Sequence, residues 1–174
     1  VGHNVKAVAT NGEGLYVAVG TGGYIATSTD LINWTQQTSG SSLDFNDIAY
    51  GDGVFIAVGG KQRIYKSADG GVTWALKYEG SAGGSWHSHS IAYGNGGFMV
   101  GGTAQDTLNE NNLYFSTDGG ETWGGRDVGT GTTVLYISFA NNQFVLTSYD
   151  GSTIYTAPTA DSSLTTIATG ITVF

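Results

Sequence analysis

Carboxylates are the residues of this sequence best placed to do chemistry, because two of them held about 5 to 10 Å apart across a cleft can hydrolyse a glycosidic bond. Asp44, Asp47 and Asp150 fall near the ends of expected strands, from which they could face a shared central opening. Solvated turn residues are the simpler interpretation, since Asp is common in turns. We therefore predict that the protein is not an enzyme, and a glycoside hydrolase is the catalytic alternative that these acids leave open.

Histidines offer a second kind of chemistry. In Trp86-His87-Ser88-His89 the two imidazoles are two residues apart and would share one face of a strand. Together with His3 they could begin a metal site. The sequence contains no cysteine, and no obvious carboxylate partner accompanies the pair. We therefore interpret the segment as an exposed polar strand edge and predict no metal and no other cofactor.

Aromatic side chains could bind sugars by stacking. Tyr24, Trp86 and Tyr149 are the candidates, although aromatic residues also pack the interior of β-sheets. Glycan binding stays open as an alternative.

Charge excludes some partners. The chain has 6 basic and 14 acidic residues and a net charge of −8. A nucleic-acid surface needs clustered lysine and arginine, and an anionic membrane attracts the same residues. No apolar run approaches the roughly 20 residues that span a bilayer. We expect no nucleic acid partner and no membrane insertion. The start at Val1, without a signal-peptide pattern, is interpreted as a boundary within a longer protein or a processed end.

The elements that must position these residues come from one unit that occurs four times. A strand, a Gly/Asn/Asp turn and a second strand occupy residues 47–59, 90–101 and 136–146, with a looser copy at 7–20. Such turns tolerate the positive φ angles of tight hairpins. The second strand can be apolar on both faces, as in Phe55-Ile56-Ala57-Val58, which indicates cover on both sides.

A third strand and a second turn complete each unit. The third strands lie at 25–28, 64–67, 113–116 and 154–157, and the units span about 5–38, 44–79, 86–128 and 134–168. Four antiparallel strands repeated at this period predict the blades of a small β-propeller. The predicted fold is all-β, with residues 1–174 forming a single domain of four four-stranded blades.

The second turn carries a motif. Residues 67–74 and 116–123 both fit S-x-D-x-G-x-T-W, residues 28–34 are a shorter copy, and residues 157–164 are degenerate, with Leu164 in place of Trp. The motif resembles the Asp-box, or BNR repeat, of sialidases and other propellers, and the resemblance covers nearly the whole chain. The box residues are Ser28, Asp30, Trp34, Ser67, Asp69, Gly71, Trp74, Ser116, Asp118, Gly120 and Trp123.

The chemistry of the motif is structural. Its Asp can accept backbone N–H groups within the turn, its Gly takes the left-handed conformation, and its Trp packs on the blade. Sialidases bind the substrate carboxylate with three arginines, whereas only Arg63 and Arg126 are present here. The resemblance therefore implies a shared fold without sialidase activity.

The residue pattern of the repeats also resembles the repeats of bacteriophage tail and virion proteins and of photosystem-assembly propellers of the YCF48 type. This resemblance implies a non-catalytic structural or host-attachment module of a phage virion, located in the tail. The alternative is a bacterial surface or assembly-factor propeller, at the cell surface or outside the cell, that binds protein or glycan.

The ends of the repeat array suggest partners. The fourth unit contains Pro158 and lacks Trp, and the β-prone segment Ile171-Thr172-Val173-Phe174 has no place in the four-unit scheme. Unpaired strands invite edge pairing. We expect contacts with other virion or assembly subunits, or with the rest of a longer polypeptide.

Overall fold

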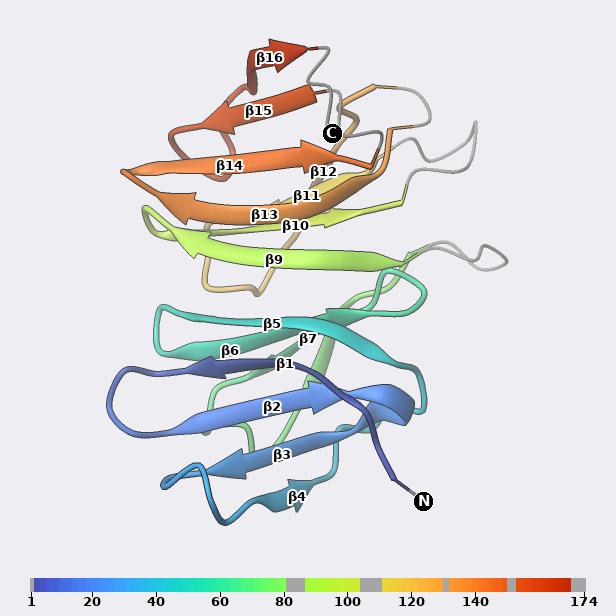
Figure 1. Ribbon diagram of the computed structural model, residues 1–174, viewed down its shortest axis with the longest axis vertical. Coiled ribbons are helices and arrows are strands. Elements are labelled where there is room, and N and C mark those ends of the chain that lie inside the picture. The colour runs from blue at the N-terminus through green and yellow to red at the C-terminus, as the bar shows by residue number, and fades with distance from the viewer. Residues whose placement is uncertain (1, 81–86, 104–110, 130–131, 150–152, 170–174) are drawn as a thin grey trace, which may run out of the picture.

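The computed structural model describes residues 2–80, 87–103, 111–129, 132–149 and 153–169. Its strands form four antiparallel sheets of four strands each, and the strand order in every sheet follows the chain (Figure 1). We call these sheets blades 1 to 4. The prediction of an all-β propeller fold with four four-stranded blades is confirmed.

The strands have the following bounds. Blade 1 contains β1 (Val5–Thr10), β2 (Tyr16–Gly20), β3 (Ile25–Ser28) and β4 (Thr35–Gln37), and blade 2 contains β5 (Phe45–Gly51), β6 (Val54–Gly59), β7 (Ile64–Ser67) and β8 (Ala75–Tyr78). Blade 3 contains β9 (Ser88–Gly94), β10 (Gly97–Gly102), β11 (Leu113–Ser116) and β12 (Gly124–Arg126), and blade 4 contains β13 (Val134–Ala140), β14 (Gln143–Ser148), β15 (Thr153–Ala157) and β16 (Thr165–Thr169). The described residues add one 3-10 turn, Thr21–Gly23. No helix among them is long and apolar enough to cross a bilayer.

Tight turns join the first two strands of blades 2 to 4. Both central residues of each turn have positive φ, as in Asp52 (49°) and Gly53 (76°) or Asn95 (48°) and Gly96 (75°). This is the backbone of a type I′ turn, whose twist matches that of the flanking strands. The Gly/Asn/Asp pairs in the sequence thus select the hairpin.

The blades are arranged side by side through their first strands. β1 packs beside β5, β5 beside β9, and β9 beside β13. In Figure 1 blade 1 extends downward from β1 and blade 4 extends upward from β13, so the end blades point in opposite directions. The blades therefore form an open arc, and β5 and β9 separate the first strands of the end blades.

Buried apolar side chains fill the seams between neighbouring blades. The middle strands β6 and β10 are buried along their whole length. The seam of blades 1 and 2 buries Val17, Val19, Ile25, Phe45, Ile48 and Phe55, that of blades 2 and 3 buries Ile56, Val58, Ile64, Ile91, Phe98 and Val100, and that of blades 3 and 4 buries Met99, Leu113, Val134, Ile137, Phe144 and Leu146. Each blade buries its faces only against its neighbours, as stacked repeats must.

Every first strand contains a register shift near its start. The shift falls between Val5 and Ala7 in β1, between Phe45 and Asp47 in β5, and at the corresponding places in β9 and β13. An extra residue of this kind bends the strand and interrupts its ladder. The shifts align the four repeats residue by residue, so that Ala7, Asp47, Ser90 and Tyr136 are structurally equivalent.

Candidate functional site

The motif residues form hairpin turns between the third and fourth strands, which we call the Ser-Asp-Trp turns (residues 28–34, 67–74 and 116–123). In the second of them, Asp69 Oδ1 accepts the backbone N–H of Thr73 at 2.9 Å, and Oδ2 accepts the Thr73 hydroxyl at 2.6 Å. The corresponding carboxylates of blades 1 and 3 also accept backbone N–H groups of their own turns. Each carboxylate thus supplies the acceptors that the turn backbone needs.

Two further groups complete each turn. Ser67 Oγ accepts the N–H of Gly71 at 2.8 Å, and Trp74 Nε1 donates to the carbonyl oxygen of Gly71 at 2.9 Å. Gly71 has a φ of 87°, the left-handed region that glycine adopts without strain. Leu31 takes the equivalent place in blade 1 with a φ of 62°.

The carboxylates of these turns are held in the charged form. Hydrogen bonds donated within each turn hold the pKa of Asp30, Asp69 and Asp118 below the ordinary value of 3.8. A general acid needs a pKa near the working pH, and each of these groups lies on a different blade. The turns are therefore suited to fixing the backbone. The residues that the sequence analysis named for these turns are Ser28, Asp30, Trp34, Ser67, Asp69, Gly71, Trp74, Ser116, Asp118, Gly120 and Trp123.

The acids near strand ends have structural partners. Asp44 accepts the N–H of Gly22 at 2.9 Å and the Lys6 ammonium at 3.0 Å, and these contacts hold its pKa below the ordinary value. Asp47 accepts the N–H of Ile91 on blade 3 at 2.9 Å, while burial raises its pKa. Asp150 lies outside the described residues. These contacts link neighbouring blades. Among the described residues, Asp44 and Asp47 therefore do not form a pair of unbonded carboxylates that could flank a glycosidic bond.

Side chains of the first strands bond across two seams. Ser90, the equivalent of Asp47, accepts the N–H of Ile137 on blade 4 at 3.1 Å. Sequence reasoning missed this pattern. Its signal was the alignment of Asp47 with Ser90 in two repeats, each one residue before an isoleucine, Ile48 or Ile91.

The histidines do not assemble a metal site. His89 Nε2 lies 2.8 Å from Thr103 Oγ1, its ring centroid is 6.3 Å from that of His87, and burial lowers its pKa. His3 instead stacks on Tyr24, with 4.8 Å between ring centroids. No group of three or more metal-ligating side chains occurs among the described residues.

The sequence expectation for this segment needs a correction at His89, whereas His87 is exposed as expected. His89 is half-buried rather than on an exposed edge, because β9 packs between β5 and β13. Of the aromatic candidates, Tyr24 is half-buried, Tyr149 is exposed, and Trp86 lies outside the described residues.

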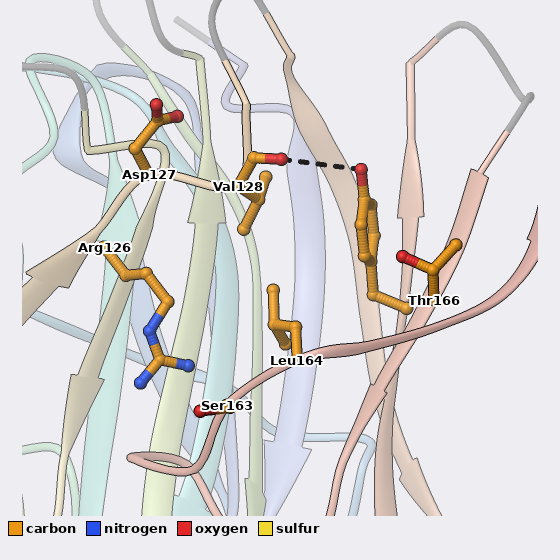
Figure 2. Close-up of a pocket in the computed structure, with 7 residues that line it drawn as sticks. Arg126, Asp127, Val128, Ser163, Leu164 and Thr166 are labelled. Atoms are coloured by element: carbon orange, nitrogen blue, oxygen red, sulfur yellow. Dashed lines mark hydrogen bonds between the residues drawn. The ribbon is translucent and has the colours of Figure 1, made fainter.

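A pocket of about 300 Å³ lies in the seam of blades 3 and 4. Figure 2 shows its residues, which come from the end of β12 and the two residues after it, from β15, and from the start of β16 and the two residues before it. The lining consists of Arg126, Asp127, Val128, Tyr155, Ser163, Leu164 and Thr166. A volume of this size is at the lower end of small-ligand pockets.

The pocket occurs where this seam has lost aromatic side chains. Leu164 directly precedes the first paired residue of β16, the place that Trp123 occupies before β12. In the seam of blades 2 and 3, Tyr78 and Tyr114 pack with ring centroids 4.8 Å apart. At the equivalent positions, the seam of blades 3 and 4 has Arg126 and Tyr155. The sequence signal for the pocket was thus the missing Trp.

Arg126 borders the pocket and is fixed in place. Its guanidinium donates to the carbonyl oxygens of Ser162 and, at 2.7 Å, Asp161, and it lies 5.3 Å from the centroid of the Phe115 ring. The Tyr155 hydroxyl lies 3.5 Å from the carbonyl oxygen of Val128. The pocket combines hydroxyl and carboxylate groups with apolar walls, so it can hold a small ligand that has both hydroxyl groups and an apolar face.

Comparison with known proteins establishes the fold. No family model matches the chain, and no curated protein matches it. Among solved structures, the GH74 enzyme of Niastella koreensis is similar with a TM-score of 0.71 and 18% identity over 94% of this chain and 30% of that chain. The designed protein Ika4 is similar with a TM-score of 0.60 and 12% identity over 96% of this chain and 92% of that one.

YCF48 bound to D1 peptide is a further neighbour, with a TM-score of 0.61 and 15% identity over 94% of this chain and 54% of that chain. The chain therefore spans less than two thirds of the GH74 and YCF48 chains. The GH74 and YCF48 neighbours are propeller-type proteins, and at such low identity the likeness concerns the fold alone.

Proposed function

We propose that this chain is a non-catalytic host-attachment module of a bacteriophage virion, carried in its tail, that binds a cell-surface glycan. The observation that carries the proposal is the pocket between blades 3 and 4. The hydroxyl groups of Ser163 and Thr166 can bond sugar hydroxyls, as can the Asp127 carboxylate, of which one oxygen also accepts the N–H of Gly129 at 2.8 Å, while Leu164 and Val128 offer apolar contact. The phage setting rests on the resemblance of the repeats alone.

The salt bridges and hydrogen bonds of the Asp and Glu side chains support a non-catalytic role. Glycoside hydrolysis needs two carboxyl groups that flank the bond. Glu79 pairs with Arg63 at 2.6 Å, Glu121 pairs with Lys66 and Lys77 at 2.6 Å each, and the acids of the Ser-Asp-Trp turns are bonded to backbone. The GH74 likeness makes hydrolysis the alternative that an assay must address.

The test fills the pocket without disturbing the rest of the surface. In Leu164→Trp the indole should occupy the pocket and abolish binding to an immobilised panel of bacterial surface polysaccharides. Leu76→Trp, made at an exposed leucine of β8, is the matched control and should bind as the parent does. Release of reducing sugar by the parent chain, or equal binding by both variants, would contradict the proposal.

Peptide binding supports a second candidate, an assembly-factor or bacterial surface propeller. YCF48, which shares the fold, was solved with a D1 peptide. Mass spectrometry of purified virions separates the two candidates: a virion component appears in fixed proportion to tail proteins, whereas an assembly factor is recovered with one cellular partner.

A further inference from the structure

The open side of blade 1 exposes positions that are buried in every other blade. Val5 is 53% exposed and Val8 is 50% exposed. Their structural equivalents in blades 2 to 4 are Phe45 (1%), Ser88 (0%) and Val134 (0%) for Val5, and Ile48 (5%), Ile91 (5%) and Ile137 (7%) for Val8. Exposure here follows from a missing neighbour, since the strand geometry is the same.

These buried equivalents all face the preceding blade. Ile48 packs with Val17 and Val19 of blade 1, and Ile137 packs with Met99 of blade 3. Val8 must therefore face the place where a blade would precede blade 1. The apolar area exposed in blade 1 continues into its Ser-Asp-Trp turn, where Leu31, Ile32 and Trp34 are exposed.

The open side of blade 4 presents the complementary positions. Tyr136 is 70% exposed and is equivalent to Asp47 and Ser90, which bond to the next blade. Val145, half-buried, is equivalent to Met99, which is fully buried against blade 4. Equivalent positions thus form the contact between each pair of neighbouring blades. Blade 1 exposes the positions that face a preceding blade, and blade 4 exposes the positions that face a following blade.

We propose that a second copy of this chain closes the arc into a two-fold ring, with blade 4 of each copy against blade 1 of the other. The end blades point in opposite directions (Figure 1), so a second arc can meet both open faces at once. A two-fold arrangement leaves no open face and therefore forms a closed particle rather than a fibre.

Side-chain sizes favour this pairing. A Cβ at Gly51 would lie 2.1 Å from the Tyr93 ring, and a Cβ at Gly94 would lie 2.1 Å from the Phe139 ring. Blade 4 has Ala140 at the glycine position, so its open face excludes an aromatic ring there. Blade 1 has Thr10 at the aromatic position. Ala140 therefore fits against Thr10, whereas it would clash with the aromatic residue that an inner blade has at the same position.

Engineered cysteines test the contact directly, because the chain contains no cysteine. Asp47 Oδ2 meets the N–H of Ile91 across a seam at 2.9 Å, and Tyr136 and Val8 are the equivalents of these two residues. Mixing Val8→Cys with Tyr136→Cys should give a covalent dimer with a short bis-maleimide. Ile167→Cys, exposed elsewhere on blade 4, replaces Tyr136→Cys in the control mixture and should give none.

A matched pair of charge substitutions checks the oligomer itself. Val8→Asp should convert the dimer to monomer in light scattering, whereas Val72→Asp, at a valine of the same exposure (51% against 50%), should stay dimeric. A monomeric parent chain would overturn the proposal, as would a dimer that survives Val8→Asp. Cross-linking of Val8→Cys to itself as readily as to Tyr136→Cys would also overturn it, because blade 1 would then pair with blade 1. So would closure of the arc by further blades of a longer polypeptide.

Discussion

Asp118 shows how much of a turn one carboxylate can hold. It accepts the N–H groups of Glu121 and Thr122 at 3.1 and 3.0 Å, together with the hydroxyls of Ser116 and Thr122. Without it, both N–H groups would depend on water in a turn whose serine is buried. The side chain acts through backbone geometry, and its effect should appear in stability.

Asp118→Ala should therefore lower the free energy of unfolding by about 1–2 kcal/mol, since it removes several acceptors from a partly exposed turn. Thr117→Ala, at the exposed neighbour in the same turn, should change it by less than about 0.5 kcal/mol. Urea denaturation of both variants provides the measurement. Full stability in Asp118→Ala together with lost ligand binding would instead assign the residue to function.

The same carboxylates predict acid sensitivity. The pKa values of Asp30, Asp69 and Asp118 are lowered in the fold, so unfolded chains take up protons first as the pH falls. Their contribution is complete above the unfolded value of 3.8 and is lost as the pH falls through the folded values. Asp47 acts in the opposite sense, because burial raises its pKa and folding favours its protonated form.

The pKa values of Asp44 and Glu121 are lowered as well, so five carboxylates oppose the effect of Asp47, and stability should fall between about pH 5 and about pH 3. Urea denaturation at the two pH values measures the decrease. Asp118→Asn, which cannot ionise at this position, should lose less stability over the interval than the parent chain, and an unchanged decrease would contradict the assignment.

At the scale of elements, the spacing of the blades depends on glycines in the seams. Gly94→Ala would place a methyl 2.1 Å from the Phe139 ring of the next blade, whereas Gly96→Ala, at a φ of 75°, has no atom within 4 Å of its methyl. We expect a cost of about 2–3 kcal/mol for Gly94→Ala, from overpacking, and about 1 kcal/mol for Gly96→Ala, from backbone strain. Thermal denaturation should rank the two variants in that order. The reverse order would mean that blades 3 and 4 shift apart and accommodate the added methyl group of Gly94→Ala.

The elements were predictable because each is specified locally. Asp52-Gly53 and Asn95-Gly96 mark the hairpins by their own preference for positive φ, and Phe55-Ile56-Ala57-Val58 marks a covered strand by composition. Contacts between blades were not predictable in this way. Asp47 bonds to Ile91, 44 residues further on, and nothing within one repeat identifies that partner.

The candidate site was missed for a related reason. Its pocket is the space between blades 3 and 4 that the side chains of Leu164 and Arg126 leave open. The loss of Trp was visible in the sequence, but the empty volume depends on how two sheets approach each other. An open pocket of this kind depends on how two blades meet, and a repeat pattern describes only the blades.

At the scale of the whole molecule, the proposed ring makes stability depend on concentration. A dimer that unfolds to monomers has a melting temperature that rises with protein concentration. The parent chain should show this rise in calorimetry, and Val8→Asp should melt at a lower temperature that does not change with concentration. A parent chain whose melting temperature is independent of concentration would contradict the ring.

Because each first strand packs against strands of its own blade and of the adjacent blades, the chain can acquire its structure in the order of synthesis. A blade needs only about 40 residues to emerge from the ribosome before its sheet can form, and the following blade then covers one of its faces. At every stage before the last, one apolar sheet face is exposed, because the residues of the blade that will cover it have not yet been translated. A pause in translation would leave that face open to chaperones or to aggregation, so the rate of elongation should influence the soluble yield more than the intrinsic speed of hairpin formation does.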